Sequence, residues 1–173
     1  GVQTCALPIC DPSQDENACG LVQMRHSVPP KVLYHRYYYE SGINQSMIDN
    51  LSGITQLVGQ TVTLKAKDIV LDIGCNDGTL LNFYPKHFIK YGCDPSDVAQ
   101  EVKEATVVQD IFPSEELFKL LEGKKLDLIT SIAMFYDLED PVSFVKGISR
   151  FLSAKGVWVF EMSYMPRMLE LFS

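Results

Sequence analysis

The chain has 173 residues, of which 46% are hydrophobic and 21% are charged, and its formal net charge is −7. This length and apolar content suffice for one well-packed core with a small appendage. The acidic balance argues against a nucleic-acid partner, because such binding relies on cationic contacts with phosphates. No apolar run approaches the roughly 18 residues that a membrane span needs. We therefore expect a cytoplasmic globular protein, whose scattered cysteines form no secreted disulfide framework.

The first third of the chain differs in character from the rest. Cys10 and Cys19 bracket a polar stretch, and the aromatic block VLYHRYYYESG follows a little later. Two cysteines are half of a structural zinc site, but the eight residues between them exceed the usual C-x2–4-C spacing. The spacing alone therefore does not establish a metal site. A helix is predicted next, from about Gln45 to Val58.

The stretch IVLDIGCNDGTLL, residues 69–81, is the most informative part of the chain. An apolar run leads into Asp72, then Gly74, Asn76 and Gly78, and then a second apolar run. This order is typical of a strand, a tight ligand-binding turn and a helix. Gly74 permits a sharp turn and close approach of the backbone to a ligand, because glycine has no Cβ. Asn76 is among the few non-glycine residues that tolerate positive φ. The sequence therefore predicts a small-molecule site, where Asp72 can accept a hydrogen bond.

A dinucleotide fingerprint, G-x-G-x-x-G, would need glycines where this stretch has Asn76 and Thr79. The stretch instead resembles motif I of class I S-adenosylmethionine (SAM) methyltransferases, with Asn76 in place of the middle glycine. That resemblance implies that Asp72 faces the methionine amino end of SAM. It also implies that the loop backbone, from Gly74 through Cys75 to Gly78, passes under the cofactor. A nicotinamide-dependent oxidoreductase is the less favoured alternative.

A carboxylate follows the second predicted strand, Phe88 to Cys93. Asp94 lies 22 positions after Asp72, close to the offset of about 20 residues expected for a carboxylate that binds ribose hydroxyls. A carboxylate accepts two hydrogen bonds at once, which suits a vicinal diol. Pro95 then prevents the strand from continuing. We expect Asp94 and Pro95 to lie at the cofactor.

The third predicted strand, Ala105 to Gln109, is followed by Asp110 and Ile111. Methyltransferases usually place the contact to adenine at this point. Asp110 could equally be a helix cap or a turn residue. Both interpretations stay open at this stage.

Two more strands complete the predicted sheet, at Leu126 to Ile132 and at 157–161, with a helix from Val142 to Leu152 between them. The helix has apolar residues spaced for one buried face. Strands that alternate with helices imply βαβ units and a parallel sheet. The predicted fold is therefore α/β, with a Rossmann-like doubly wound, mostly parallel sheet. Ligands of such sheets bind beyond the carboxyl ends of the strands, where Asp72, Asp94 and Asp110 all fall.

Six motifs taken together resemble the C-methyltransferase family of SAM enzymes over roughly residues 10–172: CGLVQM, YYYESG, DIGCNDGTLL, GCDPS, MFYDLEDP and VFEMSYMP. Its members have an N-terminal zinc-binding domain, a Rossmann-like SAM domain and a C-terminal domain. Several methylate a carbon next to a ketone on nucleotide-linked deoxysugars. The resemblance implies that Cys10 and Cys19 match the second pair of four zinc-binding cysteines. It also implies that Tyr39, Ser41 and Gly42 pack near the methionine end of SAM, although these three could equally form an aromatic core patch that ends in a glycine turn.

The resemblance divides the chain into three parts. Residues 1–9 do not read like the family and are expected to be non-native sequence. Residues 10–44 would be the remnant of the zinc-binding domain and a linker, and an incomplete ligand set should bind zinc poorly. Residues 45–173 would be the SAM-binding domain, truncated after the fifth strand, with the family's histidine-rich catalytic segment beyond Ser173.

Methylation of carbon requires a nucleophilic carbon, most easily an enolate formed when a general base removes a proton next to a carbonyl. Of the three histidines, His26 and His87 are expected at the surface, and His35 lies in the tyrosine block. The resemblance places the base beyond Ser173, so no catalytic residue is predicted. We expect the SAM-binding part of a C-methyltransferase for a keto-sugar nucleotide or a similar small ketone. A non-catalytic SAM-binding module is the alternative.

Overall fold

The computed structural model describes residues 6–8, 16, 22–24, 28–34 and 39–171. The chain forms two compact units, one up to Leu33 and one from Tyr34 onward. In the first unit, β1 (Ala6–Pro8) pairs antiparallel with β2 (Val22–Met24), and α1 spans Pro30–Leu33. Cys10 and Cys19 lie outside the described residues, so the zinc prediction stays a prediction.

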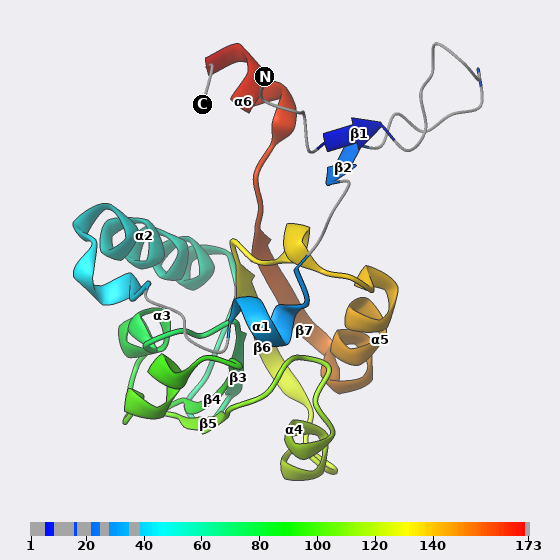
Figure 1. Ribbon diagram of the computed structural model, residues 1–173. Helices are drawn as coiled ribbons and strands as arrows, with labels where there is room; N and C mark the ends of the chain where they lie inside the picture. The colour runs from blue at the N-terminus through cyan, green and yellow to red at the C-terminus, as the bar shows by residue number, and fades with distance from the viewer. Residues whose placement is uncertain (1–5, 9–15, 17–21, 25–27, 35–38, 172–173) are drawn as a thin grey trace. The chain divides into compact units, whose positions relative to one another are not determined.

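The second unit is built on a parallel sheet of five strands in the order β5-β4-β3-β6-β7 (Figure 1). The strands are β3 (Ile69–Ile73), β4 (Ile89–Cys93), β5 (Thr106–Val108), β6 (Leu126–Ile132) and β7 (Leu152–Glu161). The chain first runs outward from β3 through β4 to β5 and then returns to the other side of β3 with β6. The predicted doubly wound α/β fold is therefore confirmed, with its topological switch point between β3 and β6.

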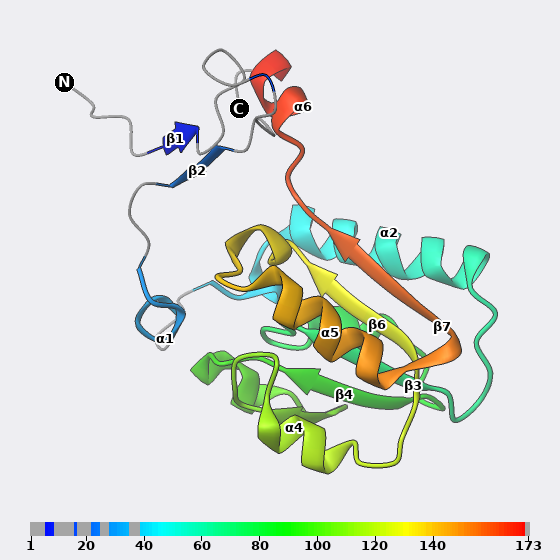
Figure 2. The ribbon, with the colours of Figure 1, turned by 90° about the vertical axis from the view of Figure 1, so that its right-hand side faces the viewer.

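Helices cover both faces of this sheet, so the second unit has three layers (Figures 1 and 2). The α-helices are α2 (Gln45–Thr61), α3 (Thr79–Phe83), α4 (Glu115–Leu120), α5 (Pro141–Phe151) and α6 (Met165–Leu171), and the 3-10 helices are η1 (Ser41–Ile43), η2 (Asp97–Glu101) and η3 (Phe135–Asp137). Helices α2 and α3 pack on one face, and α4 and α5 pack on the other.

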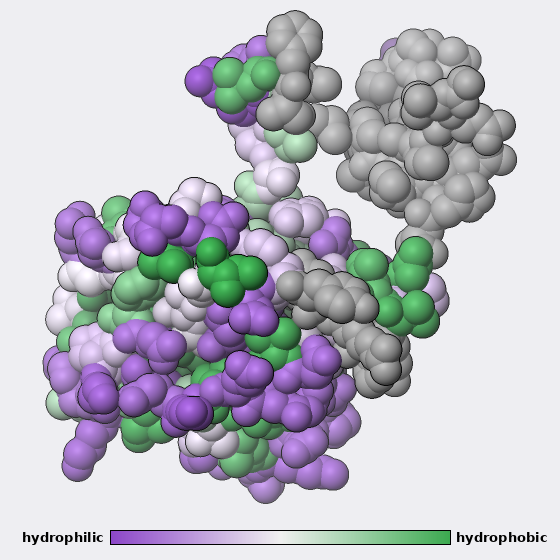
Figure 3. Space-filling model, turned by 60° about the vertical axis from the view of Figure 1, so that its left-hand side comes forward, coloured by the Kyte–Doolittle hydropathy of each residue, from purple (hydrophilic) through white to green (hydrophobic). Residues whose placement is uncertain are grey.

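Each face of the sheet has its own apolar core. Leu51 and Leu81 belong to the core under α2 and α3, whereas Leu117 and Phe144 belong to the core under α4 and α5. Leu81, Leu117 and Phe144 are fully buried, and burial of side chains of this size contributes about 1.5–3 kcal/mol each. On the surface view of the second unit, hydrophilic side chains lie between separate hydrophobic ones (Figure 3).

The predicted boundaries agree closely for β6 but not for β7. Gly156 reads as a break before a strand at 157–161, yet the strand begins at Leu152 and contains the glycine. A Cβ at position 156 would lie 2.6 Å from the Leu126 carbonyl oxygen. The pairing with β6 shifts register at this point, between Leu126 and Leu128. The glycine therefore permits a close approach of two backbones inside a strand. No helix in the described part of the chain is long and apolar enough to span a membrane.

Candidate functional site

The carboxyl end of β3 carries a buried acid. Asp72 is 3% exposed, and the strand register places it beside Thr130 of β6. Thr130 Oγ1 donates a hydrogen bond of 2.6 Å to Asp72 Oδ1. The pKa of Asp72 is raised from 3.8 to about 7, mainly by burial; the hydrogen bond from Thr130 opposes this rise and the charge of Asp94 adds to it. A carboxyl group with a pKa near 7 would be shifted toward its ionised form by a cationic ligand.

Three residues of the loop after β3 have left-handed backbone, with φ of 77° at Gly74, 49° at Asn76 and 78° at Gly78. A Cβ at Gly74 would lie 3.3 Å from Met134 Cγ, and one at Gly78 would lie 2.8 Å from Val102 Cγ1. Both glycines thus combine an unusual φ with a close neighbour, and only glycine meets both conditions without strain. The predicted turn is observed, with Asn76 at positive φ.

Asp94 is also buried, at 7% exposure, and it is held by the loop. Its Oδ2 accepts from the Asn76 backbone N at 2.9 Å, and its Oδ1 accepts from Ser96 N at 2.8 Å and Ser96 Oγ at 2.5 Å. A carboxylate has about four acceptor positions, so one remains for a ligand hydroxyl. Pro95 follows Asp94 and is half-buried.

Cys75 lies in the loop, and its buried side chain packs beside β4. A Cβ on Gly92 of β4 would lie 2.7 Å from Cys75 Sγ, so the thiol fills the space above that glycine. Burial raises the pKa of the Cys75 thiol far above its ordinary value, and the same holds for Cys93. Both cysteines are buried, and the unreactive thiol form prevails. Only the backbone of Cys75 is thus placed to contact a cofactor.

Asp110 and Ile111 follow β5 and are both half-buried. Asp110 Oδ1 accepts a hydrogen bond of 2.8 Å from the Ile111 backbone N, and its carbonyl oxygen lies 3.3 Å from Cys93 Sγ. The first contact is that of a turn residue, one of the two interpretations left open by the sequence. The pair nevertheless stands at the same edge of the sheet as Asp72 and Asp94.

The segment before α2 reaches the loop after β3 directly. Asn76 Oδ1 accepts from the Ser41 backbone N at 2.8 Å, and Asn76 Nδ2 donates to the Tyr39 carbonyl oxygen at 2.8 Å. Beside them, the Gly42 backbone N donates to Asp77 Oδ2 at 2.6 Å. The structure therefore brings Tyr39, Ser41 and Gly42 to the predicted site.

The loop after β6 forms the other side of the same edge. Ala133 has a φ of 54°, which is strained for a residue with a Cβ and is often found at functional sites. Its backbone N donates to the Glu161 carbonyl oxygen at 2.9 Å. The 3-10 helix η3 begins two residues after Ala133. Its last residue, Asp137, accepts a hydrogen bond of 2.9 Å from Tyr34 Oη.

Sequence reasoning missed Thr130, Asp77, Ser96 and Ala133. Thr130 had a usable signal, because a polar residue inside the buried run LDLITSI requires a partner. Asp77 and Ser96 act through contacts that depend on how the loops fold. The left-handed backbone of Ala133 could not be predicted, because alanine rarely adopts a positive φ.

The histidines contribute nothing in the described part of this edge. His87 is exposed, as predicted, and it precedes β4 at the opposite edge of the sheet. His26 and His35 lie outside the described residues. Within the described ranges, no three His, Cys, Asp or Glu side chains are grouped so as to hold a metal ion.

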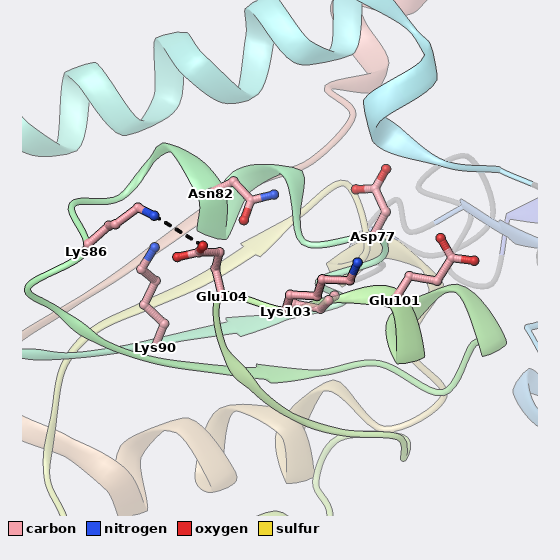
Figure 4. A pocket seen from close by; sticks show the side chains of 8 residues that line it. Asp77, Asn82, Lys86, Lys90, Glu101, Lys103 and Glu104 are labelled. Carbon is pink, nitrogen blue, oxygen red and sulfur yellow. Dashed lines mark hydrogen bonds and ion pairs between the residues drawn. The ribbon is translucent and has the colours of Figure 1, made fainter.

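A separate cavity of about 470 Å³ lies beside α3, and none of the predicted cofactor residues lines it. Its walls carry mixed charges, with Asp77, Glu101 and Glu104 facing Lys86, Lys90 and Lys103 (Figure 4). Lys90 Nζ already donates two hydrogen bonds, to the Leu81 and Tyr84 carbonyl oxygens at the end of α3, at 2.8 and 2.9 Å. This arrangement is typical of a helix C-terminal cap rather than of a ligand site.

Known proteins resemble this chain in sequence and in fold. The model of a family described as methyltransferase domain matches residues 43–170. The C-methyltransferase NovU of Streptomyces niveus is 23% identical over 165 residues, covering 88% of this chain and 37% of that protein. The ribosomal RNA small subunit methyltransferase C of Citrobacter koseri is 29% identical over 160 residues, covering 80% and 46%. The chain thus spans less than half the length of these relatives.

The structure of the plantazolicin methyltransferase BpumL in complex with S-adenosylhomocysteine (SAH) superimposes with a TM-score of 0.54 at 20% identity. The match covers 70% of this chain and 48% of that one. This likeness shows a shared fold. Because the family model covers most of the chain, the protein belongs to the methyltransferase domain family and carries a SAM-dependent methyltransferase domain.

Proposed function

We propose that the chain binds SAM at the carboxyl ends of β3 and β4, as part of an enzyme that methylates carbon in a keto-sugar nucleotide or a similar small ketone. One observation carries the cofactor assignment. The two buried acids Asp72 and Asp94 stand at the switch-point edge of the sheet, on either side of a glycine-containing turn. Ligands of doubly wound sheets bind at this edge.

The residues present fit the chemistry of SAM. Asp72 would pair with the methionine ammonium group, and the backbone of Gly74 to Gly78 would lie under the cofactor. The free acceptor position of Asp94 would bind a ribose hydroxyl, beside Pro95. Asp110 and Ile111 would flank the adenine, and the Tyr39–Gly42 segment would cover the methionine end.

Bound SAM would supply an electrophilic methyl group. The task of this chain's residues is then to orient the cofactor and exclude water, because proximity and alignment supply much of the rate in a transfer reaction. A carbon acceptor also needs a base to remove the proton next to its carbonyl. The described residues offer no histidine at this edge, so no base is assigned. We place a zinc-binding segment and its linker at 10–44 and the SAM-binding domain at 45–173.

The carbon acceptor is supported by the similarity to the C-methyltransferase NovU. The similarity to a ribosomal RNA methyltransferase supports a second candidate, methylation of RNA. The net charge of −7 weighs against it, because RNA binding depends on cationic contacts with phosphates.

Two measurements on the protein test this proposal. Calorimetric titration with SAH and, separately, with NADH identifies the cofactor class, and we expect SAH alone to bind. Transfer of labelled methyl from SAM is then measured for the enzyme that contains this chain, with keto-sugar nucleotides and small-subunit ribosomal RNA as acceptors. Label in a carbon next to the ketone agrees with the proposal, whereas label in RNA supports the second candidate. Preferential binding of NADH would contradict both.

A further inference from the structure

Three backbone groups of the segment before α2 are bound by two adjacent side chains of the loop after β3. The Tyr39 carbonyl oxygen and the Ser41 N are both held by the Asn76 amide, each at 2.8 Å, and the Gly42 N is held by Asp77 at 2.6 Å. The approach is close. A Cβ on Gly42 would lie 2.9 Å from Asp77 Oδ2 and 3.0 Å from Thr79 Oγ1. Only glycine at position 42 therefore allows this contact without displacement.

Asn76 connects this segment to the proposed ribose-binding carboxylate. Its side chain holds Tyr39 and Ser41, while its own backbone N donates to Asp94 Oδ2 at 2.9 Å. Asn76 is 8% exposed, so these hydrogen bonds are largely shielded from water, which makes their loss costly. A glycine at position 76 would adopt the φ of 49° and keep the bond to Asp94. It would lose both bonds to the segment.

The same stretch of chain has a second anchor. Tyr34 Oη donates to Asp137 Oδ2 at 2.9 Å, in the 3-10 helix that follows β6. Residues 34 and 39 are thus fixed to the loops that follow β6 and β3, the two strands at the switch point. The two loops follow the strands that border the switch point, where ligands of such sheets bind.

We propose that Asn76 is a positioning residue that couples the Tyr39–Gly42 segment to Asp94, so that closing of the segment and retention of the cofactor stabilise each other. This inference rests on the proposed function, because it takes SAM or SAH as the ligand. Any group that holds the segment closed more firmly in the bound state than in the free state raises the affinity for the cofactor, by linkage between the two equilibria. We expect this gain to be seen chiefly as slower release of the cofactor.

The direct test uses Asn76→Gly in the full 173-residue chain. Loss of two side-chain hydrogen bonds, at about threefold to tenfold each, predicts that amide exchange at Ser41 and dissociation of SAH each become about tenfold to a hundredfold faster. Hydrogen exchange measures the first quantity without ligand, and stopped-flow release of SAH measures the second. Lys67→Gly is the matched control, because Lys67 is exposed and also has a positive φ, of 73°. It should change neither rate.

Gly42→Ala perturbs the contact from the other side without changing the sequence of the loop, because its Cβ would displace Asp77. It should also speed SAH dissociation, and the double variant should release SAH little faster than either single variant, because both changes break one coupled contact. Faster exchange at Ser41 with unchanged SAH dissociation in both variants would overturn the coupling while leaving the proposed function intact. A folded wild-type chain that binds no SAH would contradict the proposed function itself, and the coupling with it.

Discussion

Asp72 is a carboxyl group of the proposed site whose pKa the fold raises into the neutral range. Its burial raises the pKa to about 7, so at pH 6 most molecules carry the neutral acid. A ligand with an ammonium group requires the carboxylate, and binding then releases a proton. With a pKa of about 7 in the free protein, SAH should bind about tenfold more tightly at pH 8 than at pH 6.

Calorimetry at the two pH values, in buffers of different ionisation enthalpy, measures both the affinity and the proton released. Asp72→Asn removes the titrating group and serves as the control. Its affinity for SAH should be weaker and nearly independent of pH over this range. An equal dependence on pH in the variant would assign the titration to a different group.

The same pKa predicts how stability changes with pH. Because the folded-state pKa lies above the ordinary value of 3.8, the contribution of Asp72 is fully present below about pH 4 and is lost as the pH rises through about 7. The melting temperature of Asp72→Asn, relative to that of wild type, should therefore be several degrees higher at pH 8 than at pH 5. Thermal melts followed by circular dichroism measure this. A constant difference between the two proteins would contradict the raised pKa.

At the scale of elements, the junction between the loop and α3 depends on Gly78. This residue precedes α3 with a φ of 78°, and a Cβ there would meet Val102 Cγ1 at 2.8 Å. Gly78→Ala should lower the free energy of unfolding by about 2–4 kcal/mol, the sum of backbone strain and overpacking. Urea unfolding measures this loss.

Gly123→Ala separates these two effects. Gly123 has a similar φ of 73°, but a Cβ there would meet nothing within 4 Å. This variant should lose only about 1–2 kcal/mol, from the left-handed backbone alone. Adding Val102→Ala to Gly78→Ala should recover part of the difference. Equal losses for Gly78→Ala and Gly123→Ala would show that the contact with Val102 relaxes at no cost.

Boundaries of elements could be predicted where the local signal is complete. The run LDLITSI predicts β6 from Leu126 to Ile132, the bounds observed. Gly156 misled the prediction for β7 because its role comes from the neighbouring strand, whose Leu126 carbonyl approaches it. A glycine that ends an element and one that admits a close neighbour look alike in a sequence.

At the scale of the whole molecule, the parallel sheet explains why spacing alone could locate Asp72 and Asp94. In a parallel sheet with alternating strands and helices, the carboxyl ends of all strands lie at one edge. Residues that directly follow the strands therefore lie close together. The partners of these acids could not be predicted in the same way. Thr130 meets Asp72 across 58 positions of sequence, and Asn76 meets Ser41 across 35. Such contacts depend on which strands and loops become neighbours.

If this edge of the sheet binds the cofactor through Asp94, calorimetric titration of SAH should distinguish wild type, Asp94→Ala and Asp97→Ala, each first shown to be folded by circular dichroism. Asp97 is the matched control, since it is an exposed acid three residues away in η2. We predict that wild type and Asp97→Ala bind SAH equally well. Asp94→Ala should bind at least about tenfold more weakly, because it loses a charge-assisted hydrogen bond to the ribose. Undiminished binding by folded Asp94→Ala, or no binding by folded wild type, would contradict the account.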